Sequence, residues 1–192
     1  MSFPACAIGS AVAITGTVVT IMVWGYETAP KQDKTEQALP AQKSSAAPSG
    51  PLEIPSPIPG KVVSLENVPD ETFSTGVLGN GFAVEPSEGK VYAPFDGECE
   101  NLADTLHALG LLSETGVSLL IHVGLETVAL EGKPFKPHVK TGDKIKKGQL
   151  LLEFDIDAIK AAGCETIVPV LVTNEDEVGE AKVEADKIVI GG

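Results

Sequence analysis

Short apolar runs of strand length, separated by glycine and proline, fill the chain from about Leu52 to its end. The clearest are residues 62–65, 81–84, 90–93, 148–154, 166–172 and 187–190. A longer run, residues 117–128, is rich in β-branched side chains and carries one imidazole, which is typical of a strand buried on both faces. Many short strands with frequent turn signals predict an all-β domain, an antiparallel β-sandwich. We expect only short helices, at residues 72–74 and 157–162, the second ended by Gly163.

A weak internal repeat supports this prediction. Residues 56–65 and 93–102 each read as a small residue, a proline, two further residues and a glycine, followed by a strand that ends in leucine. Proline and glycine three positions apart define a β-turn that leads into each strand. A third turn-and-strand unit, residues 139–151, carries Gly142 and Gly148, a pattern that recurs in barrel-sandwich hybrid folds.

The first fifty residues differ in character from the rest. Residues 5–26 carry no charge, and 22 residues are enough to cross a hydrocarbon core of about 30 Å. Trp24 and Tyr26 stand at the end of this run, where a membrane span would place interfacial aromatic residues. We therefore expect a membrane-spanning helix within residues 1–29, the alternative being a buried helix or hairpin. Residues 30–50 read as a flexible linker, and residues 51–192 as the globular domain.

Charge limits the partners. The chain has a formal net charge of −13 and no arginine. Three acids and three lysines in residues 27–50 cancel, so residues 51–192 carry all of the excess. An acidic domain repels phosphate backbones, which argues against nucleic acid and favours a basic protein partner. Cys6, Cys99 and Cys164 lie far apart and predict reduced thiols in a cytoplasmic protein.

Three histidines are the candidates for chemistry. His138 lies in a lysine-rich loop and is expected at the surface. His122 lies in the long apolar run and His107 lies fifteen residues upstream, and we expect these two imidazoles to face each other. The plain alternative is two partly buried rings that hydrogen-bond to backbone carbonyls. The chemical alternative is a phosphoryl carrier, because a neutral imidazole whose other nitrogen is held as a donor is a good nucleophile.

Neighbouring residues would assist such a carrier. Thr105 could orient the His107 ring through its hydroxyl, and His107 could then donate a hydrogen bond to the phosphoryl oxygens. Gly124 has no side chain, so backbone N–H groups around it could supply further donors without arginine.

The sequence also resembles a known family over residues 52–192. It is similar to the IIA domain (EIIA type 1) of the glucose/β-glucoside class of the bacterial phosphoenolpyruvate-dependent sugar phosphotransferase system. The resemblance is carried by YAPFDG at 92–97, DTLHA at 104–108, LIHVGLETV at 120–128, EGKPF at 131–135, GDKI at 142–145 and EFD at 153–155. It implies a β-sandwich of the barrel-sandwich hybrid type.

The resemblance also implies roles for residues and partners. His122 would accept the phosphoryl group from the phosphocarrier HPr, as tele-phosphohistidine, with His107 stabilising the group and Thr105 orienting His107. A cysteine on a IIB domain would be the next acceptor. Residues 1–29 would be the last helix of a IIC permease, which places the IIA domain at the cytoplasmic face of the membrane. The expected binding residues are Gly124, Val123, Leu125, Phe95 and Asp155, the three apolar ones forming a shallow docking face. No cofactor is required, and regulatory target proteins are further candidate partners.

Two other functions remain open from the sequence, and a third fails. A zinc peptidase of the barrel-sandwich type would need a third ligand, from Asp155 or Glu126. The two histidines alone could still bind zinc if a partner lent a carboxylate. A lipoyl or biotinyl carrier is disfavoured because Met1 and Met22 lie outside the domain. A purely regulatory or interaction module predicts that neither histidine affects any activity.

Overall fold

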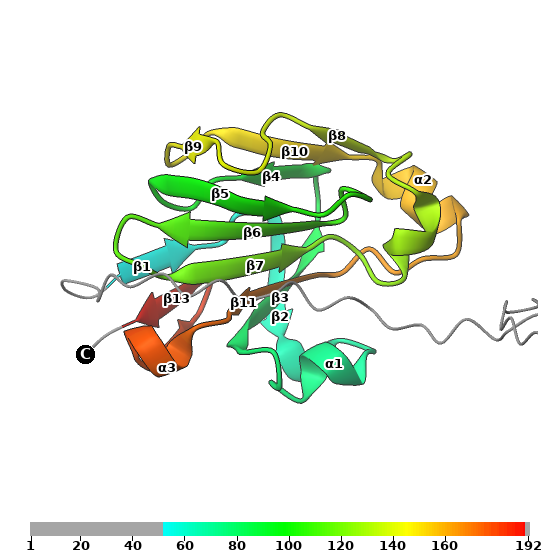
Figure 1. Ribbon diagram of the computed structural model, residues 1–192. Helices are drawn as coiled ribbons and strands as arrows, with labels where there is room; N and C mark the ends of the chain where they lie inside the picture. The colour runs from blue at the N-terminus through cyan, green and yellow to red at the C-terminus, as the bar shows by residue number, and fades with distance from the viewer. Residues whose placement is uncertain (1–51, 191–192) are drawn as a thin grey trace, which may run out of the picture. The chain divides into compact units, whose positions relative to one another are not determined.

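The computed structural model describes residues 52–190 (Figure 1). The expected membrane span and linker lie outside these residues. Within them every strand pairing is antiparallel and helices are short, which confirms the all-β prediction. No helix in residues 52–190 has the length and apolar character needed to cross a bilayer.

Three sheets make up the domain (Figure 1). The largest has seven strands in the order β2 (Gly60–Ser64), β3 (Asn80–Pro86), β11 (Val168–Val172), β7 (Ser118–His122), β6 (Ala108–Ser113), β5 (Gly97–Leu102) and β9 (Lys144–Ile145). The second has β4 (Lys90–Tyr92), β10 (Leu150–Phe154) and β8 (Phe135–Pro137), and the third has β1 (Leu52–Pro55), β13 (Lys187–Ile190) and β12 (Ala181–Glu184).

The helical segments are η1 (Leu65–Asn67), α1 (Glu71–Ser74), η2 (Thr127–Leu130), α2 (Ile156–Ala161) and α3 (Glu175–Val178). The positions of α1 and α2 were predicted, and α3 was not. Asp155 caps α2 by accepting a hydrogen bond from the Ala158 amide at 2.9 Å. Gly163, at φ +80°, follows the end of α2 as predicted. Four residues cannot hold a helix in isolation, so α1 depends on the burial of Phe73, which is 2% exposed.

Two apolar clusters lie on opposite faces of the large sheet at β7. Successive side chains of a strand point to opposite faces, so Leu119 and Ile121 enter the main core, which also takes residues from β4, β10, β1 and β13. Leu120 faces the other way and packs against a smaller cluster that contains Phe73 and Leu171. His122 follows the same alternation as Leu120, which directs its ring toward the side covered by α1.

The internal repeat has a physical basis in two glycines. Gly60 opens β2 and Gly97 opens β5, and a Cβ at either would lie within 2.2 Å of a carbonyl oxygen of the paired strand. The residue before each glycine also accepts an equivalent hydrogen bond, from Ser87 to Pro59 at 2.9 Å and from Glu114 to Asp96 at 3.1 Å. Each unit therefore needs glycine where two backbones approach most closely.

The long apolar run is not a single strand, which corrects the prediction. β7 ends at His122, and residues 127–130 form the 3₁₀ helix η2. Gly124 at φ +74° and Glu126 at φ +60° are both left-handed, so the chain turns sharply between these two elements. The apolar pattern hid this turn, because side chains on both sides of it are buried.

Candidate functional site

His122 is the last residue of β7, near the middle of the large sheet. It pairs with Ala108 of β6 and is only 5% exposed. Its ring contacts Phe73 of α1 with a centroid separation of 5.0 Å and an interplanar angle of 55°. The imidazole is therefore enclosed on one side by an aromatic ring from a distant segment.

A backbone carbonyl anchors this ring. His122 Nδ1 lies 2.7 Å from the carbonyl oxygen of Gly124. A carbonyl can only accept a hydrogen bond, so the proton of the neutral imidazole is on Nδ1 and the lone pair is on Nε2. This hydrogen bond leaves Nε2, the nitrogen at the tele position, as the ring nitrogen that carries the lone pair.

The turn that holds the carbonyl depends on glycine. A Cβ at Gly124 would lie 2.7 Å from the Glu165 carbonyl oxygen and 2.7 Å from Thr127 Cγ2, and φ of +74° also disfavours a side chain. The expected donor role of nearby amides is wrong for two of them. The Val123 amide donates to the His107 carbonyl at 2.7 Å, and the Leu125 amide donates to the Glu165 carbonyl at 2.9 Å.

His107 lies just before β6 and meets His122, as predicted. The two ring centroids are 4.8 Å apart and the rings are edge to face at 74°. His107 Nδ1 lies 2.6 Å from the Thr105 hydroxyl oxygen. Leu106 between them has φ +60°, an unusual conformation for a residue with a branched side chain, and it brings the threonine and the histidine together.

Sequence reasoning missed two residues of this site. Phe73 contacts the His122 ring, but its only signal in the sequence was an aromatic residue in a predicted single helical turn. Thr127 is fully buried, and its hydroxyl donates to the Val123 carbonyl at 2.8 Å. A threonine four residues after Val123 within an apolar run was the available signal.

The prediction that Val123, Leu125 and Phe95 form a docking face is wrong. Val123, Leu125 and Phe95 are 0%, 4% and 4% exposed, so they belong to the interior and cannot receive a partner. Among residues 52–190 the exposed large apolar side chains are instead Val77, Val128 and Val183. Val77 follows α1, which carries Phe73, and Val128 follows Thr127 in η2.

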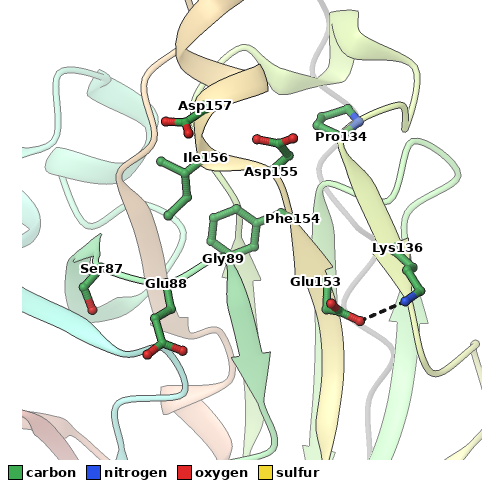
Figure 2. Close-up of a pocket in the computed structure, with 10 residues that line it drawn as sticks. All are labelled: Ser87, Glu88, Gly89, Pro134, Lys136, Glu153, Phe154, Asp155, Ile156 and Asp157. Carbon is green, nitrogen blue, oxygen red and sulfur yellow. Dashed lines mark hydrogen bonds and ion pairs between the residues drawn. The ribbon is translucent and has the colours of Figure 1, made fainter.

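Asp155 lies in a different feature from the paired histidines. Figure 2 shows it with Glu153 and Asp157 among the residues that line a pocket, together with Glu88 and Lys136. This pocket is open and has a volume of about 470 Å³. Lys136 Nζ contacts Glu153 at 3.1 Å. Because the Asp155 carboxylate caps α2, its demonstrated role is structural. His138 is exposed, as predicted, and hydrogen-bonds to Glu153.

The chain does not assemble a protein-only metal site in its described part. No three His, Cys, Asp or Glu side chains of residues 52–190 are grouped closely enough to hold an ion. Asp155 and Glu126 thus do not complete a zinc site with the two histidines, and the peptidase alternative has no support. Cys99 is buried, which raises the pKa of its thiol to about 11, and nearby Asp143 and Glu98 act in the same direction. At neutral pH this thiol is protonated and unreactive.

Comparison with known proteins places residues 52–178 in a family model described as phosphoenolpyruvate-dependent sugar phosphotransferase system, EIIA 1. A β-glucoside-specific EIIBCA component from Dickeya chrysanthemi is 40% identical over 188 residues, which cover 96% of this chain and 30% of that protein. A β-glucoside-specific EIIBCA component from Halalkalibacterium halodurans is 50% identical over 128 residues, 67% of this chain and 20% of that protein. The chain thus spans less than a third of these curated relatives.

The fold has a solved counterpart. The glucose permease IIA from Mycoplasma capricolum matches with a TM-score of 0.65 and 28% identity, covering 74% of this chain and 96% of that structure. This agreement supports the sandwich architecture independently of the strand assignments.

Proposed function

Because the chain belongs to the EIIA 1 family of the phosphoenolpyruvate-dependent sugar phosphotransferase system, we propose that His122 is its phosphoryl acceptor. A member of this family is a phosphotransferase component that carries a phosphoryl group during sugar uptake. The observation that supports His122 is the pair of facing imidazoles, each with its Nδ1 atom anchored.

The geometry matches the chemistry of a carrier. The lone pair on His122 Nε2 attacks phosphorus in phospho-HPr, a P–N bond to His122 forms, and the bond from phosphorus to its donor atom in HPr breaks. The cysteine thiolate of a IIB domain then attacks the same phosphorus and the P–N bond breaks. Nε2 recovers its lone pair, so the ring is ready for another cycle.

His107 acts on the phosphoryl oxygens. When the Thr105 hydroxyl donates to Nδ1, the His107 proton is on Nε2, which is then a hydrogen-bond donor beside His122. A donor held in place before the reaction costs no reorganisation when negative charge moves onto the phosphoryl oxygens.

The proposed docking surface for HPr and the IIB domain consists of the exposed side chains Val77 and Val128. Val77 lies just beyond α1, whose Phe73 contacts the His122 ring, and Val128 lies in η2, which follows the turn that carries Gly124. Apolar side chains at this position would pack against HPr and the IIB domain in turn. The acidic domain would attract a basic partner and raise the rate of encounter.

The relatives support a wider setting for the domain. The EIIBCA components combine IIA with IIB and IIC parts in one chain, and the alignment with the Dickeya protein covers 96% of this chain. This supports residues 1–29 as the counterpart of the last IIC helix and residues 30–50 as the linker. The IIA domain would then work at the cytoplasmic face of the membrane with IIB and IIC domains.

The paired histidines would also supply two of the four ligands of a tetrahedral zinc site. Zinc binds imidazole nitrogen and carboxylate oxygen, and two further ligands are needed beyond His107 and His122. A carboxylate from a partner protein would supply one of them, so zinc binding is expected only in such a complex.

The test is an intact-mass assay on the full chain with phosphoenolpyruvate, enzyme I and HPr. We expect the gain of one acid-labile phosphoryl group, which His122→Ala abolishes. His138→Ala is the matched control, because this exposed histidine lies outside the paired site and its loss should leave the label intact. Labelling of His122→Ala, or an unlabelled wild-type chain in the presence of phosphorylated HPr, would refute the assignment.

A further inference from the structure

Thr127 is one of the few polar side chains buried among residues 52–190, and it touches the turn that anchors His122. Its exposure is 0% and its hydroxyl donates to the Val123 carbonyl at 2.8 Å. Burying a hydroxyl is costly unless it is hydrogen-bonded, so this bond holds the hydroxyl and the Val123 carbonyl in one arrangement. The next peptide unit along the chain contains the Gly124 carbonyl.

The methyl group of Thr127 holds the same turn from another side. A Cβ at Gly124 would lie only 2.7 Å from Thr127 Cγ2, so this methyl group packs directly against the glycine backbone. Thr127 therefore fixes Val123 through its hydroxyl and Gly124 through its methyl group. The methyl group only fills the space beside Gly124, whereas the hydrogen bond of the hydroxyl is directional and helps to set where the Gly124 carbonyl oxygen points.

We propose that Thr127 is a positioning residue for phosphoryl transfer, because it holds the Gly124 carbonyl that selects the reactive tautomer of His122. This inference rests on the proposed function for its kinetic consequence. The Gly124 carbonyl oxygen accepts a hydrogen bond from His122 Nδ1, with 2.7 Å between the two atoms. This hydrogen bond decides which ring nitrogen carries the proton. A displaced carbonyl allows the proton to move to Nε2, where it blocks the lone pair needed for attack.

The turn has a second support that is independent of the Thr127 hydroxyl. The Leu125 amide donates to the Glu165 carbonyl at 2.9 Å, and these two residues form an isolated β-bridge. The Gly124 carbonyl belongs to the same planar peptide unit as the Leu125 amide, so this bond also constrains the carbonyl. Removal of the Thr127 hydroxyl should consequently leave the turn folded and allow this peptide unit to tilt about its remaining hydrogen bond. This expectation distinguishes a positioning role from a purely structural one.

The test compares Thr127→Val, which keeps the shape and removes the hydroxyl, with Thr127→Ser, which keeps the hydroxyl. The first readout is the tautomer of His122, measured by ¹H–¹⁵N NMR on the full chain with ¹⁵N-labelled histidine. We expect the proton on Nδ1 in the wild-type protein and in Thr127→Ser, and a mixture of tautomers in Thr127→Val. The second readout is the initial rate of phosphorylation by phospho-HPr, which should fall roughly five-fold in Thr127→Val, the loss of one hydrogen bond.

Each outcome is decisive. A folded Thr127→Val with the wild-type tautomer and rate would overturn the proposal, as would a wild-type His122 that carries its proton on Nε2. If Thr127→Val does not fold, Thr127→Ser decides, because loss of the Nδ1 proton there would contradict a role for the hydroxyl. The NMR readout needs no phosphorylation. Absence of label in every variant, with the tautomers as expected, would therefore count against the carrier function and not against the role of Thr127.

Discussion

The two histidines of the site are held by turns that differ in kind. His122 is 5% exposed, and its Nδ1 atom meets the Gly124 carbonyl at 2.7 Å. His107 is half-buried, and its Nδ1 atom meets the Thr105 hydroxyl at 2.6 Å. The first anchor is a backbone group within a tightly packed turn. The second is a side chain placed by the left-handed backbone of Leu106.

The difference lies in what each anchor permits. A carbonyl only accepts, so it fixes one tautomer of His122 and keeps one nitrogen nucleophilic. A hydroxyl can donate or accept, so His107 can present either a donor or an acceptor toward its neighbour. A nucleophile benefits from a single tautomer, whereas a group that assists both arrival and departure of a phosphoryl group benefits from a choice.

The largest effect that separates the two turns is expected from His107→Gln. Glutamine can still donate one neutral hydrogen bond, so His122 should still acquire the phosphoryl group in the intact-mass assay. Transfer to a IIB domain should slow by roughly 10²–10³-fold, because glutamine cannot reproduce the imidazole donor at its position. Rapid-quench kinetics with labelled IIA and an excess of IIB measures this step. Normal onward transfer would remove His107 from the mechanism.

A smaller effect is expected on stability, because the turns at Gly124 and Gly132 differ in how tightly they are packed. Gly124→Ala and Gly132→Ala both place a side chain at positive φ, +74° and +79°, which costs about 1–2 kcal/mol in each case. Only at Gly124 would the new Cβ meet atoms at 2.7 Å, including the Glu165 carbonyl. At Gly132, beside Leu106, the nearest atom is an ordinary contact at 3.5 Å.

Gly124→Ala should therefore lose about 1–3 kcal/mol more unfolding free energy than its matched control Gly132→Ala. Urea denaturation of the two variants measures the difference. It should also reduce phosphorylation, because the displaced carbonyl no longer anchors His122. Equal stabilities would show that the turn at Gly124 can relax, and that the Gly124 carbonyl does not hold His122 rigidly.

Much of this contrast could be predicted from the sequence. The apolar run with one imidazole indicated a buried strand, and the spacing of Thr105 and His107 indicated a hydroxyl within reach of the ring. The prediction that His107 and His122 face each other was correct, because their segments join neighbouring antiparallel strands, β6 and β7. Antiparallel pairing places the start of β6 beside the end of β7, where the two histidines lie.

The errors have separate physical causes. The run at residues 117–128 was taken as one strand, so the turn at Gly124 was missed. Val123 and Leu125 were then placed on a surface, although Val128 is the apolar member of the run that is exposed. Phe73 was missed because its contact with His122 joins segments far apart in the chain, and no periodic pattern records such a contact. Asp155 was assigned to binding from its motif alone, whereas its carboxylate caps α2.

The smallest expected effect concerns the anchor of His107. Thr105→Val removes the hydroxyl and keeps the shape, so the His107 ring loses one neutral hydrogen bond worth about 1 kcal/mol. Transfer to IIB should slow roughly five-fold, and Thr105→Ser should restore the wild-type rate. The tautomer of His122 should not change in either variant, because the Gly124 carbonyl holds it independently. If Thr105→Val altered the His122 tautomer in ¹H–¹⁵N NMR spectra, the two anchors would form one coupled network, and the division of labour between a fixed nucleophile and an adjustable partner would fail.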